Sequence, residues 1–397
     1  MKVLLLAPQP FYQLRGTPIA VKRFAEACSR NGWRVDILAF HEGAPVNIPD
    51  VRVFRIPRIP WTRGMHPGFS LKKVACDVAL LFSTVRRLRK ERYDLVQAGE
   101  ESVFIAMLCR WMGGPPYVYD MDSCISDQIS GSHPILKPIL PLMESLEGIA
   151  IRGASAVLAV CDALAAYAKS HGGRNITVLP DAPLCGPPAG RAAAERKEGA
   201  ATAFMYIGNL EEYQGIDLLI EAFTLLARSD SRSTLDIIGG AREHIAKYAG
   251  ICGEKRIAER VRFRGEQPPE RLGEFMAEAD VLVSPRIKGK NTPMKIYSYL
   301  QAGKPILATD IPSHTQALSP DFACLTPPEP DAMARAMGRL ASDPALRAEI
   351  GERALRVARA RFTPEAFDRT AFAFCDLVEG LLANGRRAEA APSLRPC

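Results

Sequence analysis

Residues 284–305, SPRIKGKNTPMKIYSYLQAGKP, combine a helix start with a high density of cations. The segment Asn291-Thr292-Pro293 predicts a helix with Thr292 as its N-cap and Pro293 at its first helical position, where a missing N–H costs nothing. Because the amino end of a helix already carries partial positive charge, cations near it are unfavourable without a ligand. Four cations nevertheless surround this end: Arg286, Lys288, Lys290 and Lys295.

A bound diphosphate would explain this concentration of charge. Helix N–H groups attract phosphate, so the backbone of residues 291–294, up to Met294, could hold one together with the Thr292 hydroxyl. Lys295 would add a charged hydrogen-bond donor, and Lys288 or Lys290 could add further charge. The alternative is a solvated basic loop that binds nothing.

A second loop, PQPFYQLRGTP (residues 8–18), follows the apolar run KVLLLAP. Its end, Gly16-Thr17-Pro18, again predicts a helix start with Thr as the N-cap and Pro at the first helical position. Glycine lets the backbone approach a ligand closely, so Gly16 is a candidate donor contact. Arg15 beside it is a candidate for an acceptor phosphate. The alternative is a tight turn that caps a helix. Because the same Thr-Pro helix start occurs in both loops, we favour two capped helices that face one site.

Carboxylates follow two further apolar runs. Asp120 and Asp122, in VYDMDS, are alternate residues and would share one face of an extended strand end. Like charges so placed raise one pKa, which suits a base that handles the proton of a hydroxyl; helix capping is the alternative. Glu100 and Glu101 follow YDLVQAG and could bind acceptor hydroxyls or begin a helix. His314, in DIPSHTQAL, could contact a sugar or cap a helix.

The scaffold that must position these loops is an alternation of strands and helices that occurs twice. Apolar runs predict buried strands, and the segments between them predict helices. The expected strands are KVLLLAP, WRVDILAF, YDLVQAG, PPYVYDMD, ASAVLAVC and NITVLP, then TAFMYIG, TLDIIGG, VRFRGE, ADVLVSP, KPILATD and ACLTP. This alternation indicates parallel sheets covered on both faces. We expect an α/β fold of two Rossmann-like domains facing a central cleft, which is then the expected ligand site.

The expected boundaries follow from composition. The first domain covers residues 1–180, and the Pro, Gly and charge of residues 181–200 predict a linker. A second domain covers residues 201–365, a helix covers residues 366–384, and residues 385–397 are expected to be disordered.

Composition indicates a globular protein. The 397 residues are 47% hydrophobic and 24% charged, and no apolar run suggests a membrane span. The opening MKVLLLAP is too short for a signal peptide. Ten cysteines without a metal spacing read as reduced thiols, so we expect a cytoplasmic protein without metal sites or disulfides.

Charge is uneven along the chain. Residues 51–92 hold eleven Lys and Arg against Asp77 and Glu91. Interleaved aromatic and aliphatic residues, Trp61 among them, suit the surface of an anionic membrane. A solvated helix face with its apolar residues in the core is an equally good interpretation. Nucleic acid is disfavoured, because no binding motif accompanies the basic patch.

Three segments together carry a resemblance: YIGNLEEYQGIDLLIEAF, RFRGEQPPERLGEFMAEADVLVSPR and NTPMKIYSYLQAGKPILATD. With the order of elements and the N-terminal glycine loop, they make the chain similar to the family 4 retaining glycosyltransferases of the GT-B fold. The resemblance implies transfer of a sugar from a nucleotide diphosphate sugar, with retention at the anomeric carbon and no required metal or cofactor. It implies a donor on the second domain, an acceptor on the first, and a final helix that crosses back to the first domain.

Within this resemblance the chain departs from the usual pattern at several positions. Two glutamates of the family, one near the sugar and one on the ribose, correspond to Lys290 and Ser298. An Arg and a Lys that commonly contact the diphosphate correspond to Asn209 and Gln214, which follow Gly208. A branch with NTPxK in place of the glutamate motif is the closer match. The position of a frequent catalytic histidine corresponds to Asp122, with Asp120 beside it.

We therefore expect a hexosyltransferase that moves a sugar from a nucleotide diphosphate sugar to an acceptor hydroxyl. The basic segment suggests a lipid or lipid-linked acceptor and peripheral contact with the inner face of the cytoplasmic membrane. A sugar-nucleotide epimerase is one alternative, since it needs no acceptor. A protein that binds sugar nucleotides without turnover is another, given the missing glutamates.

Overall fold

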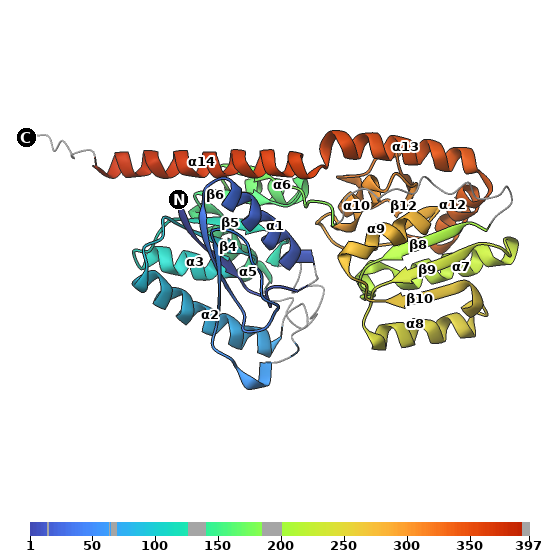
Figure 1. Ribbon diagram of the computed structural model, residues 1–397, viewed down its shortest axis with the longest axis horizontal. Coiled ribbons are helices and arrows are strands. Elements are labelled where there is room, and N and C mark those ends of the chain that lie inside the picture. Colours follow the sequence, from blue (N-terminus) through green and yellow to red (C-terminus); the bar gives the residue numbers. More distant parts are fainter. Residues whose placement is uncertain (14–15, 63, 65–69, 126–139, 185–200, 391–397) are drawn as a thin grey trace, which may run out of the picture. The chain divides into compact units, whose positions relative to one another are not determined.

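The computed structural model describes residues 1–13, 16–62, 64, 70–125, 140–184 and 201–390 (Figure 1). The chain divides into two compact units. One unit comprises Met1–Pro180 with Glu365–Cys397, and the other comprises Asp181–Pro364. Each unit has its own sheet and its own core, and they are described separately.

The first unit is built on a seven-stranded sheet in the order β3-β2-β1-β4-β5-β6-β7. All neighbouring strands in it are parallel. The strands are β1 (Lys2–Ala7), β2 (Arg34–Ala39), β3 (Val51–Arg55), β4 (Leu95–Gly99), β5 (Tyr117–Met121), β6 (Ala156–Ala159) and β7 (Ile176–Val178). This arrangement confirms the predicted α/β class, because parallel strands need crossover helices to connect them.

Helices cover both faces of this sheet. In β1, Leu4 and Leu6 belong to a core that also contains residues of α2, α3, α5 and α6. The other face is covered by α1, against which α14 packs through the ring pair Phe24–Phe374. These helices are α1 (Gly16–Arg30), α2 (Leu71–Lys90), α3 (Ser102–Trp111), α5 (Leu140–Gly153), α6 (Asp162–Ser170) and α14 (Pro364–Ala390). A short 3₁₀ turn, η1 (Pro60–Thr62), precedes α2.

The last helix packs on the first unit although it follows the second in the sequence. Trp33 Nε1 donates to Glu379 Oε1 at 2.8 Å, and Arg30 Nη2 donates to Asp368 Oδ1 at 2.6 Å. The helix runs to Ala390, beyond the predicted end at residue 384 and into the predicted disordered tail. The reason is that RRAEA consists of strong helix formers.

Strand β3 is absent from the sequence-based expectation, which treated residues 51–92 as one basic segment. The segment VRVFR pairs with β2 at the sheet edge instead. Arg52 there donates two hydrogen bonds to Asp36, each 2.7 Å long. Part of the local positive charge is therefore neutralised by an acid on the neighbouring strand.

The second unit has a six-stranded parallel sheet in the order β10-β9-β8-β11-β12-β13. Its strands are β8 (Ala203–Ile207), β9 (Thr234–Ile238), β10 (Val261–Gly265), β11 (Val281–Ser284), β12 (Ile306–Thr309) and β13 (Cys324–Thr326). Its helices are α7 (Ile216–Ser229), α8 (Arg242–Glu254), α9 (Pro269–Glu278), α10 (Lys295–Gln301), α11 (Pro312–Thr315), α12 (Pro330–Ser342) and α13 (Pro344–Arg361), with 3₁₀ turns η3 (Glu212–Gln214) and η4 (Ala258–Arg260).

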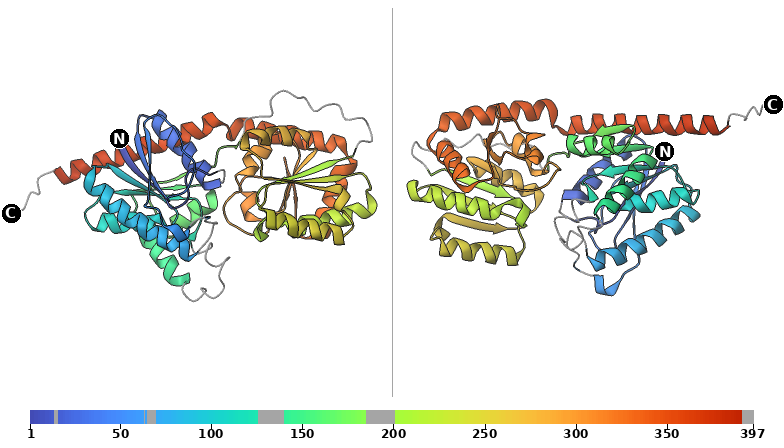
Figure 2. Two further views of the ribbon diagram at one scale, coloured as in Figure 1. Left: turned by 60° about the horizontal axis from the view of Figure 1, so that its bottom comes forward. Right: turned by 180° about the vertical axis from the view of Figure 1, so that it is seen from behind.

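Successive residues of β8 enter opposite cores, as the period of two in a strand requires. Phe204 and Tyr206 pack with residues of α7, α8 and α12. Met205 and Ile207 pack with residues of α9 and α10. Both faces of the second sheet are thus covered by helices (Figure 2), which leaves the ends of its strands as the place for a ligand.

None of the described helices is both long and apolar enough to cross a bilayer.

Candidate functional site

In the second unit, the strand order places a switch point between β8 and β11. From β8 the chain proceeds to β9 and β10 on one side, and it then returns to β11 on the other. Loops that leave two such strands diverge, and the crevice at their carboxyl ends is where open α/β sheets bind ligands. Gly208 and Asn209 directly follow β8. Arg286 follows β11, with one residue between it and the end of the strand.

Lys295 projects into this switch point from the first turn of α10. Its Nζ donates to Gln214 Oε1 at 3.1 Å and lies 3.9 Å from the ring centroid of Tyr206. The side chain is 8% exposed. Burial, followed by the charge of Arg286, lowers the pKa of Lys295 well below its usual value. An anion beside Nζ would restore the charged form, since opposite charge favours ionisation.

The absence of a side chain at Gly208 leaves room for the Lys295 amine. Gly208 has a φ of +150°, and a Cβ at this position would lie 2.9 Å from Lys295 Nζ and 2.8 Å from Tyr206 Oη. A side chain at this position would therefore displace the amine. The structure thus brings together Gly208, Gln214 and Lys295, which are predicted donor contacts, and adds Tyr206, for which the sequence offered no signal.

Arg286 organises the loop that follows β11. Its Nε donates to Lys288 O at 2.6 Å, and its Nη1 and Nη2 donate to Asn291 O and Oδ1 at 3.1 and 2.9 Å. Gly289, with φ +123°, is needed in the turn because a Cβ there would lie 2.1 Å from Arg286 Nη2. This cation therefore holds Asn291 in place, and the side chains of Lys288 and Lys290 remain exposed.

The predicted helix start requires a correction. Thr292 is not the N-cap and Pro293 is not the first helical residue, because α10 begins at Lys295 with Met294 in the N-cap position. Pro293 O accepts instead from Ile296 N at 2.9 Å, a tight turn of the 3₁₀ type that precedes the helix. Thr292 is 2% exposed, and within the described residues its hydroxyl has no hydrogen-bond partner.

Two other predicted donor contacts have local partners. Ser298 Oγ accepts from Leu184 N at 2.9 Å, so it secures the segment that enters the second unit. Asn209 Nδ2 donates to Tyr213 Oη at 3.3 Å, within the turn after β8. In the described part of the chain, neither side chain forms a hydrogen bond with Lys295.

His314 has a structural position that neither interpretation anticipated. Its Nε2 lies 2.8 Å from Ser284 Oγ, and its Nδ1 lies 2.9 Å from Thr309 O. Burial, with further contributions from Lys295 and Arg286, lowers the pKa of His314 to about 3. The neutral ring therefore ties β11 to β12 inside the core.

In the first unit, acidic side chains gather at the carboxyl end of β4, beside the switch point between β1 and β4. Glu100 has a φ of +47°, which is uncommon for a residue other than glycine. Glu101 is the N-cap residue of α3, so it stands at a helix start as one interpretation expected, and its Oε1 lies 2.6 Å from Lys73 Nζ. Glu100 Oε2 lies 3.9 Å from the same amine. Asp77, one helical turn after Lys73, has no hydrogen-bond partner at Oδ1 among the described residues.

The titration of this cluster follows from burial and mutual repulsion. Burial and then Glu101 raise the pKa of Asp77, while Lys73 opposes them. Burial likewise raises the pKa of Glu101 against the effect of Lys73. Burial lowers the pKa of Lys73, but Glu101 and Glu100 outweigh it and raise that pKa overall. Asp77 and Glu101 thus lie beside a charged lysine, and their raised pKa values allow them to retain a proton near neutral pH.

Asp120 and Asp122 are placed differently from each other. Asp120 lies within β5, and its Oδ2 accepts from Gln97 Nε2 at 2.8 Å. Burial raises the pKa of Asp120 to about 6, and the charge that adds to it is Glu100, whereas the sequence suggested Asp122. Asp122 follows the strand and is half-buried.

Of the two glycine-loop candidates, Arg15 lies outside the described residues. Gly16 is the first residue of α1, so Thr17 is inside the helix and not its cap. A Cβ on Gly16 would meet no atom within 4 Å. Packing within the described residues therefore does not require glycine there.

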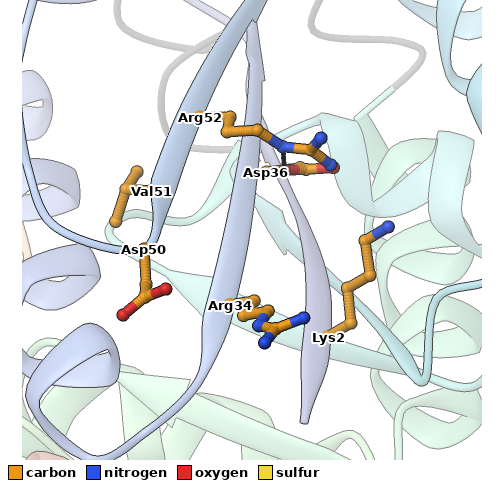
Figure 3. Close-up of a pocket in the computed structure, with 6 residues that line it drawn as sticks. All are labelled: Lys2, Arg34, Asp36, Asp50, Val51 and Arg52. Atoms are coloured by element: carbon orange, nitrogen blue, oxygen red, sulfur yellow. Dashed lines mark hydrogen bonds and ion pairs between the residues drawn. The ribbon is translucent and has the colours of Figure 1, made fainter.

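A cavity of about 360 Å³ lies at the amino edge of the first sheet (Figure 3). It is lined by Lys2, Arg34, Asp36, Asp50, Val51 and Arg52. Arg52 and Asp36 already bind each other, as the close-up shows. Because open α/β sheets bind ligands at the opposite edge, we assign neither donor nor acceptor to this cavity.

Within the described ranges, no group of three or more His, Cys, Asp and Glu side chains is arranged to hold a metal ion.

Two family models match this chain. "Glycosyl transferase 4-like domain" matches residues 15–182, and "Glycosyl transferases group 1" matches residues 192–357. A D-inositol 3-phosphate glycosyltransferase of Streptomyces griseus is 29% identical over 213 residues, which cover 50% of this chain and 44% of that protein. The match thus spans less than half the length of that curated relative.

Solved structures share the fold. Sucrose-phosphate synthase from Thermosynechococcus elongatus superposes with a TM-score of 0.80 and 18% identity, covering 96% of this chain and 99% of that one. The Anabaena protein HepE in complex with UDP-glucose superposes with a TM-score of 0.72 and 18% identity, covering 95% and 99%. These neighbours confirm the predicted GT-B type of fold.

Proposed function

Because the chain belongs to the group 1 glycosyltransferase family, we propose that it transfers a sugar from a nucleotide diphosphate sugar to an acceptor hydroxyl. The transfer retains the anomeric configuration and needs no metal, as the sequence resemblance implies. The observation that carries the proposal is the buried Lys295 amine, 3.1 Å from Gln214 Oε1 at the β8–β11 switch point.

The diphosphate of the donor binds beside Lys295. Three features support this placement: the amine is buried, its pKa is lowered, and the neighbouring Thr292 hydroxyl has no partner among the described residues. A diphosphate would supply the missing negative charge, and one of its oxygens would accept a hydrogen bond from the Thr292 hydroxyl. As the bond to the sugar breaks, charge grows on the leaving diphosphate, so a cation fixed there stabilises the transition state more than the ground state.

Lys295 also compensates for the lysine that the family pattern has at position 214 and this chain lacks. A lysine at that position would reach toward the diphosphate, and this chain has Gln214 instead. Since Gln214 accepts a hydrogen bond from Lys295 Nζ, the cation is supplied from α10 to nearly the same place. We place the chain in a branch in which the lysine of NTPxK has this role.

The acceptor binds in the first unit beside Glu101, Asp77 and Asp120. Lys73 Nζ lies within 3.9 Å of Glu100 and Glu101, and Glu100 also raises the pKa of Asp120. This predominance of acids does not favour a phosphate at this point. Hydroxyl groups instead donate well to carboxylates. We therefore propose that a sugar or polyol hydroxyl occupies this position and that Asp122 orients its proton. A lipid or a lipid-linked glycan is the proposed carrier of that hydroxyl, at the cytoplasmic face of the membrane.

A screen of nucleotide sugars tests the donor half of the proposal. UDP-, GDP- and ADP-sugars are added in turn, and the thermal unfolding of the full chain is recorded. A ligand at about 100 times its Kd stabilises by about 2.7 kcal/mol, and Lys295→Gln must reduce the shift. The product of a turnover assay then gives the anomeric configuration by NMR. A new epimer without acceptor would indicate an epimerase, and binding without any product would indicate a non-catalytic protein.

A further inference from the structure

One helical layer of the first unit carries most of the exposed apolar side chains. Twelve large apolar side chains are exposed in the described part of the chain, and ten of them lie on η1, α2, α3 and α5 or directly after α3. These ten, which we call the outer helical face, are Trp61, Leu71, Val74, Val78, Phe82, Leu108, Trp111, Met112, Leu142 and Ile149. Single exposed apolar residues are normal, but such a concentration indicates an interaction surface.

The apolar residues of α2 form a stripe. Leu71, Val78 and Phe82 recur at seven and four residues, so they share one side of the helix. Phe82 is 69% exposed and Leu71 is 79% exposed. The opposite side packs into the core through Cys76 and Leu80. The helix therefore presents an apolar face that the first unit does not cover.

Cations surround this stripe. Arg86, Arg89 and Lys90 are exposed in the last two turns of α2, and Arg110 and Arg152 are exposed on α3 and α5. On the described residues of these three helices, the one exposed acid is Glu144. An apolar stripe with a basic rim complements an anionic bilayer, because acyl chains take the apolar groups and lipid phosphates take the cations.

We propose that the outer helical face docks on an anionic membrane surface, with Leu71, Val78 and Phe82 inserted at the level of the headgroups. Trp61 and Trp111 of the outer helical face are 58% and 67% exposed, and the amphipathic indole ring prefers the interface of a membrane. Part of the basic segment of residues 51–92 has another role, because Arg52 and Lys73 pair with acids.

Charge argues against a second copy of the chain as the occupant. In a two-fold dimer the same patch meets itself, so the basic rim with Arg86, Arg89 and Lys90 would face the basic rim of the second copy. Like charges across an interface oppose association. A bilayer with acidic lipids has no such penalty.

Helix α2 also connects this surface to the acceptor site. Leu71 and Val74 point outward in the same turn from which Lys73 reaches Glu101. A helix with its side chains is about 10–12 Å thick, so the proposed acceptor site lies about one helix diameter from the membrane. This consequence rests on the proposed transferase function, whereas docking itself does not.

Vesicle co-sedimentation of the full chain tests the docking. Vesicles of phosphatidylcholine are compared with vesicles that contain phosphatidylglycerol in addition. We expect binding to the mixed vesicles that weakens as salt rises from 0.1 to 1 M, because the screening length shrinks from about 10 to about 3 Å. Equal binding to both vesicle types, or no binding to either, would overturn the proposal.

Matched variants locate the surface. Each basic residue near an anionic surface contributes roughly fivefold, so Arg86→Gln with Arg89→Gln should lower the partition coefficient about 30-fold. Arg356→Gln with Arg359→Gln has the same spacing on α13, where both are exposed, and should change nothing. Val78→Ser with Phe82→Ser should lower binding by about tenfold or more. Leu377→Ser on α14 is its control.

Native tryptophans provide a second readout. The chain has three, and Trp33 is buried while Trp61 and Trp111 lie on the outer helical face. Brominated phosphatidylglycerol should quench fluorescence in wild type, and Trp61→Phe with Trp111→Phe should remove that quenching. Quenching that persists in this variant contradicts the proposed surface.

Light scattering tests self-association. If Val78→Ser with Phe82→Ser converts a dimer to a monomer and vesicles never bind, the face is a self-association surface instead. Lost transferase activity with intact vesicle binding would count only against the proposed function.

Discussion

Lys295 Nζ lies 3.1 Å from Gln214 Oε1, although the two residues are 81 positions apart in the sequence. Neither residue has an obvious role alone: the lysine is buried and the glutamine is uncharged. Together they place an amine at the carboxyl ends of β8 and β11. The proposed sugar-nucleotide site therefore depends on two positions, either of which could carry the positive charge.

Exchanging the two residues tests this relationship. A hydrogen bond to a charged group contributes about 1.5–3 kcal/mol, so Lys295→Gln should weaken donor binding roughly 10- to 150-fold. Adding Gln214→Lys should return part of that affinity, because the new amine starts from the neighbouring position. Isothermal calorimetry with the donor found by screening measures all four proteins as a double-mutant cycle. Simple additivity of the two effects would show that the positions do not share one phosphate.

Removing the lysine should also stabilise the protein. The folded-state pKa of Lys295 is lowered, so the unfolded chain binds the proton more readily and folding is opposed below the unfolded pKa near 10.5. Lys295→Met should raise Tm by about 2–4 °C at pH 7.5, for about 1 kcal/mol. The gain should shrink as pH approaches 10.5, which calorimetry at pH 7.5 and 10 can follow. A lower Tm at pH 7.5 would mean that the amine is structural.

The fold was predictable because it depends on local patterns. Buried strands such as KVLLLAP and TAFMYIG are apolar runs between turn residues, and all twelve expected runs contribute strands. Strand β3 was missed because Arg52 and Arg55 interrupt its apolar pattern, and their partners Asp36, Gly43 and Ala44 are brought near only by folding.

The candidate site was predictable in part for the same reason. Its position followed from the strand ends, and Lys295 followed from local charge. The contacts of Lys295 with Tyr206 and of Lys73 with Glu101 join segments that are distant in sequence. Helix-start preferences wrongly predicted Thr292 as the N-cap, because a tight turn at Pro293 precedes the helix. That turn depends on contacts of the surrounding loop, which the local sequence does not show.

Donor binding should take up a proton. Burial and the charge of Arg286 lower the pKa of Lys295, and a diphosphate beside it would raise that pKa. At a pH between the two values, binding must protonate the amine, so affinity should fall as pH rises, by up to tenfold per unit. Calorimetry in buffers of different ionisation enthalpy gives the proton number directly. Lys295→Met should bind weakly with no proton uptake, and uptake that survives in this variant would assign the proton elsewhere.

Asp77 should make the first unit less stable at higher pH. Burial, with Glu101, raises the pKa of Asp77 from 3.8 to about 8. Between these values the folded state holds more protons than the unfolded state, so stability falls as pH rises. In Asp77→Asn this contribution is absent, and the loss of Tm between pH 5 and pH 8 should be smaller than in wild type. Glu352→Gln, at an exposed site on α13, is the control. Parallel profiles for Asp77→Asn and wild type would refute the assignment.

Asp120 and Asp122 should separate in their effects on turnover. If Asp122 handles the proton of the acceptor hydroxyl, Asp122→Asn should lower kcat by about 10² and leave donor affinity unchanged. Asp120 lies within β5, and its pKa is raised to about 6 by burial and Glu100. If its ionised form is required, kcat/KM should rise between pH 5 and 7, and Asp120→Asn should flatten that rise. Asp120→Glu tests whether the charge alone suffices, since it keeps a carboxylate but shifts its position against Gln97. A pH profile identical in wild type and Asp120→Asn would leave Asp120 with only a packing role, and equal kcat in wild type and Asp122→Asn would remove Asp122 from the chemistry.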